Sequence, residues 1–312
     1  MMAAEIIDGF RIAEDLKLQV ALEARQVTAD GLDCGLATVL VGDDPASAAY
    51  ARRLRRTAAD LRIPCRSVAL PALSSEQEVL ATIGRLNADP AISGILVMRP
   101  LPAHLSEARV FQAVSPVKDV EALHPENAGL LALGMPRYVP STAAAAFHLL
   151  DRWLDEAGED RAAFYHRSLI VVVGRSNNVG KPALLLAYDR QAAVESVDEW
   201  ASANGQLGWH TRRADVLIVA AGVRGLIRSE HVREGAIVVD VGIHAVDDAA
   251  TGEVRIVGDV AFDEVATRAR AITPVPGGVG AVTDVWLLRN TVAAARNAAA
   301  GGDRPLSYAG SE

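Results

Sequence analysis

Three small residues at fixed spacing, Gly174, Ser176 and Gly180, form a G-x-S-x-x-x-G frame that could hold a phosphate. The apolar, β-branched run Leu169–Val173 precedes them, as expected of a strand buried on both faces of a parallel sheet. Gly174 suits a tight turn, and Gly180 lets a helix pack closely on the strand, as in dinucleotide-binding folds. The frame is looser than G-x-G-x-x-G, so an ordinary strand, turn and helix is the alternative.

Two acidic residues follow the next apolar run. Asp198 and Glu199 lie about 24 residues after Gly174, close to the offset of about 20 residues at which an acid binds the ribose 2′-hydroxyl of NAD. Because two carboxylates would repel a 2′-phosphate, this pattern predicts NAD as the cofactor. Two alternatives stay open: both acids simply begin a solvated helix, or Arg175 in the turn meets the phosphate of NADP.

The composition fits a two-domain α/β protein. The chain has 312 residues, of which 50% are hydrophobic and 4% aromatic, which allows two cores of ordinary size. A net charge of −8 provides no general attraction for nucleic acid. Two cysteines and seven histidines without paired ligand spacing predict no metal site. No membrane-spanning stretch and no secretory signal are visible, so we expect a cytoplasmic protein.

Apolar runs and helical patterns alternate along the chain, which is typical of βα units in a parallel sheet. The expected strands are Leu36–Val41, Ser67–Leu70, Gly94–Val97, Leu169–Val173, Ala193–Val197, Val216–Ala220 and Ala236–Val241. The expected long helices are Ile6–Val27, Thr142–Leu154 and Thr283–Ala300. We predict two α/β domains: residues 1–141 plus 284–312, and residues 142–283, which form a Rossmann-like, doubly wound parallel sheet.

Several unusual strings occur in fixed order along the chain. They are VGDDPAS-AAY (Val41–Tyr50), GILV-x-x-PLP (Gly94–Pro102), KDV (Lys118–Val120), HPEN-A-G (His124–Gly129), VVGRSNNVGKP (Val172–Pro182), VDVGI (Val239–Ile243), GDV (Gly258–Val260) and TPVPGGVG (Thr273–Gly280). On these strings the chain resembles the methylenetetrahydrofolate dehydrogenase/methenyltetrahydrofolate cyclohydrolase family, from Ile6 to about Thr291.

The resemblance implies a folate-binding cleft between the two domains, a final helix that returns to the first domain, and a homodimer formed through the nucleotide domain. It implies oxidation of 5,10-methylenetetrahydrofolate by hydride transfer to a nicotinamide and, in bifunctional members, hydrolysis of the methenyl product to 10-formyltetrahydrofolate. The implied folate-binding residues are Tyr50, Pro100, Leu101, Glu121, Gly277, Gly278 and Thr283. The implied cofactor-binding residues are Gly174, Arg175, Ser176, Val179, Gly180, Asp198, Glu199, Ala221, Gly222, Val241, Gly242 and Ile243.

Two positions depart from the family pattern where its chemistry takes place. Members that match Tyr50 carry a lysine four residues later and a glutamine after GILV, whereas this chain has Leu54 and Met98. Loss of both halves of one polar pair predicts a methylenetetrahydrofolate dehydrogenase whose cyclohydrolase activity is weak or absent. With the two acids described above, we expect it to use NAD. One alternative is a bifunctional NADP-dependent enzyme. Another is a folate-binding paralogue that is non-catalytic or acts in secondary metabolism.

Smaller departures surround the same position. Glu121 replaces the aspartate that holds the pterin in the family, and Asp284 enters just after Thr283. Arg53 lies three residues after Tyr50, near the same helix face, where a guanidinium could fix a charge. We expect Arg53 to be solvated instead, as part of an exposed basic helix face.

Overall fold

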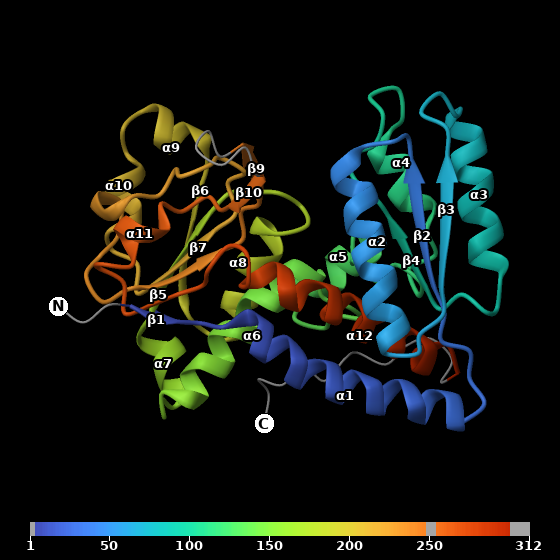
Figure 1. Cartoon of the computed structure of the whole chain (residues 1–312), viewed down its shortest axis with the longest axis horizontal. Coiled ribbons are helices and arrows are strands. Elements are labelled where there is room, and N and C mark those ends of the chain that lie inside the picture. Colours follow the sequence, from blue (N-terminus) through green and yellow to red (C-terminus); the bar gives the residue numbers. More distant parts are fainter. Residues whose placement is uncertain (1–3, 248–253, 300–312) are drawn as a thin grey trace. The chain divides into compact units, whose positions relative to one another are not determined.

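The computed structural model describes residues 4–247 and 254–299. Contacts divide the chain into two compact units, one of residues 1–14 and 142–283 and the other of residues 15–141 and 284–312. We call them the six-stranded unit and the three-stranded unit, after the main sheet of each, and Figure 1 labels both sheets. Residues 300–312, which the sequence analysis placed in the first domain, lie outside the described residues.

The six-stranded unit is built on a parallel sheet with strand order β1-β11-β8-β7-β5-β6. Its strands are β1 (Glu5–Ile6), β5 (Leu169–Val173), β6 (Ala193–Val197), β7 (Val216–Val219), β8 (Ile237–Asp240) and β11 (Ala271–Ile272). The order reverses at β5, because β6 pairs with one edge of β5 and β7 with the other. Doubly wound folds bind ligands at such a switch point, beyond the carboxyl ends of the strands.

Short helices and one hairpin complete the six-stranded unit. They are α6 (Ser141–Glu156, of which Ser141 belongs to the three-stranded unit), α7 (Arg161–Arg167), α8 (Gly180–Asp189), α9 (Glu199–Ala203), α10 (Leu207–Thr211), η1 (Ser229–His231), α11 (Phe262–Val265) and the antiparallel pair β9 (His244–Asp247) and β10 (Val254–Val257). One core joins the central strands, through Val171 and Leu217, to α10 and α11, through Leu207 and Val265. The central strands β5, β7 and β8 are buried on both faces, which explains their near-continuous apolar sequences.

The N-terminal residues belong to the six-stranded unit, whereas the sequence analysis assigned them to the first domain. Glu5 pairs with Ala271 and Ile6 with Ile272, so β1 forms the edge of that sheet. The Trp153 indole also donates a hydrogen bond of 2.9 Å to the Glu5 carboxylate. A strand of two residues carries no periodicity, so no sequence pattern indicated it.

The three-stranded unit has the parallel strand order β3-β2-β4. Its strands are β2 (Leu36–Val41), β3 (Cys65–Leu70) and β4 (Gly94–Val97). Its helices are α2 (Pro45–Asp60), α3 (Glu76–Ala88), α4 (Glu107–Ala113) and α5 (Pro125–Ala132), with parts of α1 (Gly9–Ala29) and α12 (Val279–Ala299). Val39 and Val97 of the sheet pack with Ile83 of α3 and Val110 of α4 in one core. The predicted α/β fold with parallel sheets is confirmed.

Most predicted element bounds are close to those of the structure, but the helix predicted at Ile6–Val27 spans Gly9–Ala29, and Ile6 lies in β1. The strand predicted at Ser67–Leu70 begins two residues earlier, at Cys65, and the last helix begins at Val279 rather than Thr283. No helix among residues 4–247 and 254–299 is both long and apolar enough to cross a membrane. Within the same residues, no three metal-ligating side chains come together.

Candidate functional site

The glycine-rich turn after β5 lies at the switch point of the six-stranded sheet. Gly174 has a φ of +112°, and a Cβ there would come within 2.1 Å of the Ala220 carbonyl oxygen, just after β7. A Cβ at Gly180 would come within 2.0 Å of the Gly174 carbonyl oxygen. The Gly180 amide also donates to the Ser176 hydroxyl, at 3.4 Å. Only glycine fits at both ends of this turn, and α8 begins there at Gly180, after Val179, without a side-chain cap.

Arg175 and Asp198 form an ion pair beside this turn. Arg175 Nη1 lies 2.7 Å from Asp198 Oδ2. The same guanidinium donates to the Ser196 hydroxyl at 3.1 Å and to the Ser196 carbonyl at 2.9 Å. Asp198 Oδ1 accepts from the Ala201 amide at 3.3 Å and so caps α9, whose first residue is Glu199. The two acids therefore begin a helix, which was the alternative to a ribose contact. Asp198 also neutralises the charge of Arg175.

Buried Asp259 holds the loop that follows β7. Its Oδ2 accepts from the amides of Ala221 and Gly222, at 2.7 and 2.8 Å. Its Oδ1 lies 2.7 Å from His244 Nε2, and the whole residue is 0% exposed. Asp259 belongs to the GDV string, whose sequence alone indicates no role for it. The structure shows it positioning two of the residues predicted to bind the cofactor.

Asp240 holds the loop that follows β8 in the same way. Its carboxylate accepts from the amides of Gly242 and Val260, at 2.9 and 3.0 Å. A Cβ at Gly258 would come within 1.9 Å of Asp240 Oδ2, so glycine is required there. Burial raises the pKa of Asp240 to about 7, and the charge of Asp259 acts in the same direction. Among the other predicted residues of this loop, the Val241 amide donates to the Val219 carbonyl, and Ile243 is exposed.

The loop that contains Gly277 and Gly278 packs against the start of α1. The Gly9 amide donates to the Gly277 carbonyl at 2.8 Å, and a Cβ at Gly277 would come within 2.9 Å of the Phe10 ring. A Cβ at Gly278 would come within 2.5 Å of a carbonyl oxygen of its own loop. Thr283, further along, uses its hydroxyl to donate to the Val279 carbonyl at 3.0 Å. These close contacts require glycine at positions 277 and 278, independently of the predicted contact with folate.

In the three-stranded unit, the start of α2, about one turn before Tyr50, is bonded to the segment that follows β4. Asp44 caps the helix by accepting from the Ser47 amide at 2.7 Å, and the Ser47 hydroxyl donates to the Arg99 carbonyl at 2.7 Å. Arg99 immediately precedes Pro100 and Leu101, so the start of α2 is fastened to that predicted folate-binding pair. The structure thus brings these predicted residues into one region.

Leu54 and Met98 are core residues. Leu54 is 0% exposed and Met98 is 2% exposed, whereas Tyr50 on the same helix as Leu54 is partly accessible. Burial raises the pKa of the Tyr50 phenol well above its usual range, and the charges of Glu121 and Asp284 raise it further. Neither Leu54 nor Met98 can exchange a proton, so any acid or base at this site must be another residue.

Glu121 is a half-buried carboxyl group bonded to Ser141 at the start of α6. The Ser141 hydroxyl donates to its Oε1, and the Ser141 amide donates to Oε2 at 3.4 Å. Burial raises the pKa of Glu121 from 4.5 to about 7, and the charge of Asp119 acts in the same direction, while the Ser141 bonds oppose it. Glu121 is therefore a carboxyl group that can gain or lose a proton near neutral pH.

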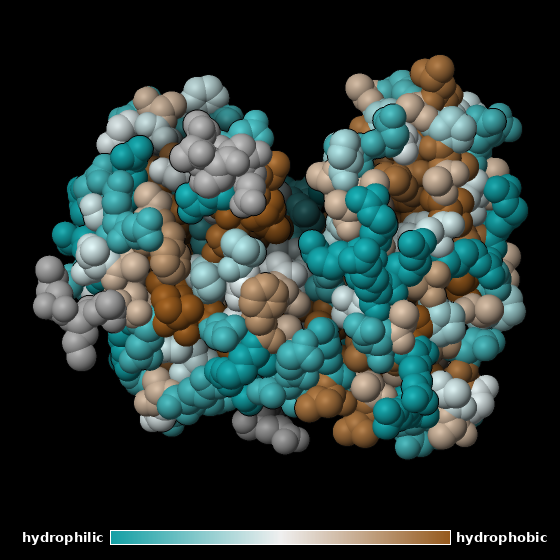
Figure 2. Space-filling model, in the orientation of Figure 1, coloured by the Kyte–Doolittle hydropathy of each residue, from teal (hydrophilic) through white to brown (hydrophobic). Residues whose placement is uncertain are grey.

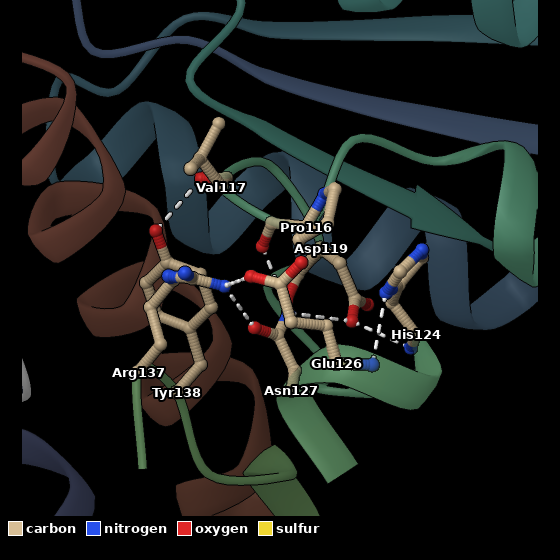
Figure 3. Close-up of polar contacts among 8 residues, drawn as sticks. All are labelled: Pro116, Val117, Asp119, His124, Glu126, Asn127, Arg137 and Tyr138. Atoms are coloured by element: carbon tan, nitrogen blue, oxygen red, sulfur yellow. Dashed lines mark hydrogen bonds and ion pairs between the residues drawn. The ribbon is translucent and has the colours of Figure 1, made fainter. Parts of the chain in front are cut away.

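A buried polar network holds the segment on which Glu121 lies (Figure 3). Asn127 is 0% exposed and donates to the Pro116 carbonyl at 2.8 Å and to Asp119 Oδ2 at 2.9 Å. The His124 amide donates to the same Asp119 oxygen at 2.7 Å. Because these bonds join residues that precede Glu121 to residues that follow it, they fix the position of the Glu121 backbone.

Arg137 and Tyr138, in the segment that precedes α6, complete this network (Figure 3). Arg137 Nη1 donates to Asn127 Oδ1 at 2.6 Å and lies 2.8 Å from Glu126 Oε1. The Tyr138 hydroxyl donates to the Val117 carbonyl at 2.7 Å. Asp119 and Asn127 belong to the KDV and HPEN strings, whose sequences alone do not indicate these positioning roles. Arg137 and Tyr138 lay in no string, so no signal pointed to them.

Arg53 differs from its expected solvated state. Its side chain is 52% exposed, but Nε lies 2.6 Å from Asp284 Oδ2 and Nη2 lies 3.0 Å from Oδ1. Asp284 itself is buried, with a side chain only 5% exposed. Arg52, Arg55 and Arg56 do conform to the expectation, since they are exposed and hydrophilic side chains gather over α2 in Figure 2. A partner 231 positions away cannot be seen in local sequence.

Comparisons with known proteins agree with this architecture. Residues 7–121 match the model of the tetrahydrofolate dehydrogenase/cyclohydrolase catalytic domain, and residues 140–299 match that of its NAD(P)-binding domain. Bifunctional protein FolD 2 of Rubrobacter xylanophilus is 57% identical over 310 residues, covering 97% of this chain and 96% of the relative.

Two solved structures are similar over almost their whole length. The bifunctional enzyme FolD of Campylobacter jejuni has a TM-score of 0.86 and 35% identity, covering 95% of this chain and 100% of that one. The Trypanosoma brucei methylenetetrahydrofolate dehydrogenase-cyclohydrolase, complexed with NADP and an inhibitor, has a TM-score of 0.87 and 33% identity, covering 96% and 99%. This chain belongs to the tetrahydrofolate dehydrogenase/cyclohydrolase family.

Proposed function

We propose that this protein oxidises 5,10-methylenetetrahydrofolate to the methenyl compound with a nicotinamide dinucleotide and then hydrolyses it to 10-formyltetrahydrofolate. The observation that carries the proposal is the similarity, over 97% of the chain, to a relative named as a bifunctional FolD protein. The six-stranded unit supports it, because Gly174 and Gly180 form a tight turn, at the switch point of the sheet, in which a Cβ at either position would clash with backbone. Dinucleotide-binding folds place the cofactor's phosphates at such a glycine turn.

The sequence predicted weak or absent cyclohydrolase activity from Leu54 and Met98. The names of the relatives favour the bifunctional alternative over that prediction. Hydrolysis needs an activated water and a proton transfer, and Glu121 is a carboxyl group with a pKa of about 7 in this region. A monofunctional dehydrogenase is the second candidate, favoured by the burial of both apolar residues. Nothing in the fold or the comparisons favours the non-catalytic paralogue.

The two reactions make different demands on the protein. When bound, the nicotinamide accepts the hydride, and the carbocation left behind is stabilised by the nitrogens of the folate itself. The chain therefore has mainly to position the folate, for which Tyr50 and the Pro100–Leu101 segment are our candidates. In the hydrolysis, Glu121 would take a proton from water or return one, and Ser141 orients its carboxyl group.

For the cofactor we propose a preference for NAD. Arg175, the cation nearest the turn, already gives its hydrogen bonds to Asp198 and Ser196. A 2′-phosphate would have to displace the Asp198 carboxylate and approach that of Glu199, at an electrostatic cost. The family model names both cofactors together, and the Trypanosoma relative binds NADP, so NADP is the alternative. Titration with each dinucleotide tests the proposal, and tighter binding of NADP would contradict it.

We also propose a homodimer formed through the six-stranded unit. Val254 in β10 and Ile243 just before β9 are 62% and 59% exposed, and an interface formed by this hairpin would bury both apolar side chains. Sedimentation velocity should show a species of twice the chain mass, whereas a monomer at micromolar concentration would contradict the proposal.

The direct test of the oxidation is to mix purified protein with methylenetetrahydrofolate and either NAD or NADP. Reduced cofactor should accumulate in proportion to enzyme concentration. Tyr50→Phe is a useful companion, because it keeps the ring that packs on the folate and removes the hydroxyl. If correctly folded protein formed no reduced cofactor with either dinucleotide, the proposed function would be wrong.

A further inference from the structure

The ion pair of Arg53 and Asp284 lies directly against Tyr50. The guanidinium carbon of Arg53 lies 5.2 Å from the centroid of the Tyr50 ring, within the range of a cation–π contact. The guanidinium also binds both oxygens of Asp284, at 2.6 and 3.0 Å. Arg53 therefore lies over the Tyr50 ring while two of its nitrogens are bonded to the Asp284 carboxylate.

Asp284 is what keeps Arg53 in that place. A carboxylate whose side chain is 5% exposed must be compensated, and the bidentate guanidinium provides two charge-assisted hydrogen bonds. Burial raises the pKa of Asp284, while Arg53, and Lys17 on α1 to a lesser degree, oppose that rise. Arg53 sits on α2 and Asp284 on α12, so the pair links these two helices beside the ring.

The neighbouring arginines show that this arrangement is particular to Arg53. Arg52 and Arg56 lie on the same helix and are exposed, and among the described residues neither forms an ion pair with an acid. An arginine three residues from Tyr50 reaches the ring because residues three apart share a helix face. The interior position of that face, four residues from Tyr50, is filled by Leu54, which is 0% exposed.

We propose that Arg53, clamped by Asp284, is a positioning residue that fixes the Tyr50 ring for folate binding, where neither Leu54 nor Met98 can offer a polar contact. The inference rests on the proposed function, in which Tyr50 contacts the folate. The clamp also has a consequence for charge. Because Asp284 neutralises Arg53, the ring is held without presenting an uncompensated positive charge to a cationic methenyl folate.

The first test needs no ligand. The chain has five tyrosines, so ring-labelled tyrosine gives five signals, of which Tyr50→Phe identifies one. The Arg53→Gln, Asp284→Asn double variant removes both charges together and leaves no buried carboxylate unpaired. It should shift and broaden the Tyr50 signal and leave the other four in place. Arg56→Gln, the matched control on the same helix, should change none of the five.

The second test separates positioning from a structural role. A loosened ring weakens ground-state and transition-state binding alike, so the double variant should raise the folate KM about tenfold with kcat within about twofold and an unchanged dinucleotide KM. Arg53→Lys, which keeps the ion pair but not the planar fork, should show a smaller rise. A fall in kcat at unchanged folate KM, or an unperturbed Tyr50 signal, would overturn the inference. Absence of turnover in the unmodified protein would refute the proposed function instead. The tyrosine ring signals would still test whether the Arg53–Asp284 pair holds the Tyr50 ring.

Discussion

Replacing Glu121 by glutamine should stabilise the three-stranded unit at alkaline pH. Glu121 is partly buried and has a pKa raised from 4.5 to about 7, with burial as the main cause. The glutamine amide can still accept from the Ser141 amide and can donate to the Ser141 hydroxyl, so the local geometry should persist. What the substitution removes is the negative charge, which the folded protein acquires only at a cost.

The sign and size of the effect follow from proton binding. Between pH 4.5 and about pH 7 the folded protein keeps the Glu121 proton that the unfolded chain has already lost. The contribution of Glu121 to the free energy of unfolding is therefore fully present below its pKa in the unfolded chain. It is lost as the pH rises through its pKa in the folded protein. At about 1.4 kcal/mol for each pKa unit, the decline amounts to about 3 kcal/mol above about pH 8. Glutamine, which cannot ionise, should not show it.

Urea unfolding at about pH 5 and about pH 8.5 measures this difference. Trp286 in α12 reports on the same unit, and the advantage of Glu121→Gln should grow from less than about 1 kcal/mol to about 3 kcal/mol. Glu107→Gln is a matched control, because Glu107 is 43% exposed and paired with Arg99, and its loss should bring no gain at high pH. If the difference in free energy of unfolding between Glu121→Gln and the unmodified protein were the same at both pH values, burial would not raise the pKa of Glu121.

Three further variants test the cofactor preference, the hydrolysis and the glycine turn. Asp198→Ser should release the neighbouring arginine and improve NADP binding relative to NAD by about tenfold, and an unchanged ratio of dissociation constants would contradict its selective role. The Leu54→Lys, Met98→Gln double variant should raise the rate of methenyl hydrolysis by about tenfold or more and lower the free energy of unfolding by about 3 kcal/mol. A folded double variant with unaltered hydrolysis would argue that Leu54 and Met98 do not occupy the positions of the family's lysine and glutamine. Gly174→Ala should cost about 3 kcal/mol in urea unfolding and weaken dinucleotide binding, while Gly205→Ala, also at positive φ but in open space, should cost no more than about 1 kcal/mol.

The fold could be predicted wherever an element buries both of its faces. The run Leu169–Val173 is such a strand, and the structure places it at the centre of its sheet. The strand Glu5–Ile6 and the hairpin of β9 and β10 were missed, because two-residue edges and half-exposed strands carry no long apolar run. Pairing of Ile6 with Ile272 is a contact of high sequence separation, which periodicity cannot reveal.

Parts of the candidate site were predictable because they lie in continuous strings. The backbone requirement at Gly174 follows from the strand before it, and the structure gives it a positive φ. The bonds of Asp240 and Asp259 to distant amides could not be derived, since each joins loops that follow different strands. The pair of Arg53 and Asp284 was missed for the same reason, although both residues had been noticed separately.

One progress curve tests whether a single chain both oxidises methylenetetrahydrofolate and hydrolyses the product. Reduced cofactor and the methenyl chromophore are followed together, with a parallel trace of methenyltetrahydrofolate in buffer alone. Our account predicts that methenyl accumulates to less than the reduced cofactor formed and decays faster than in buffer. Methenyl that stays equal to the reduced cofactor, and decays no faster than in buffer, would contradict the bifunctional proposal and establish the monofunctional dehydrogenase in its place.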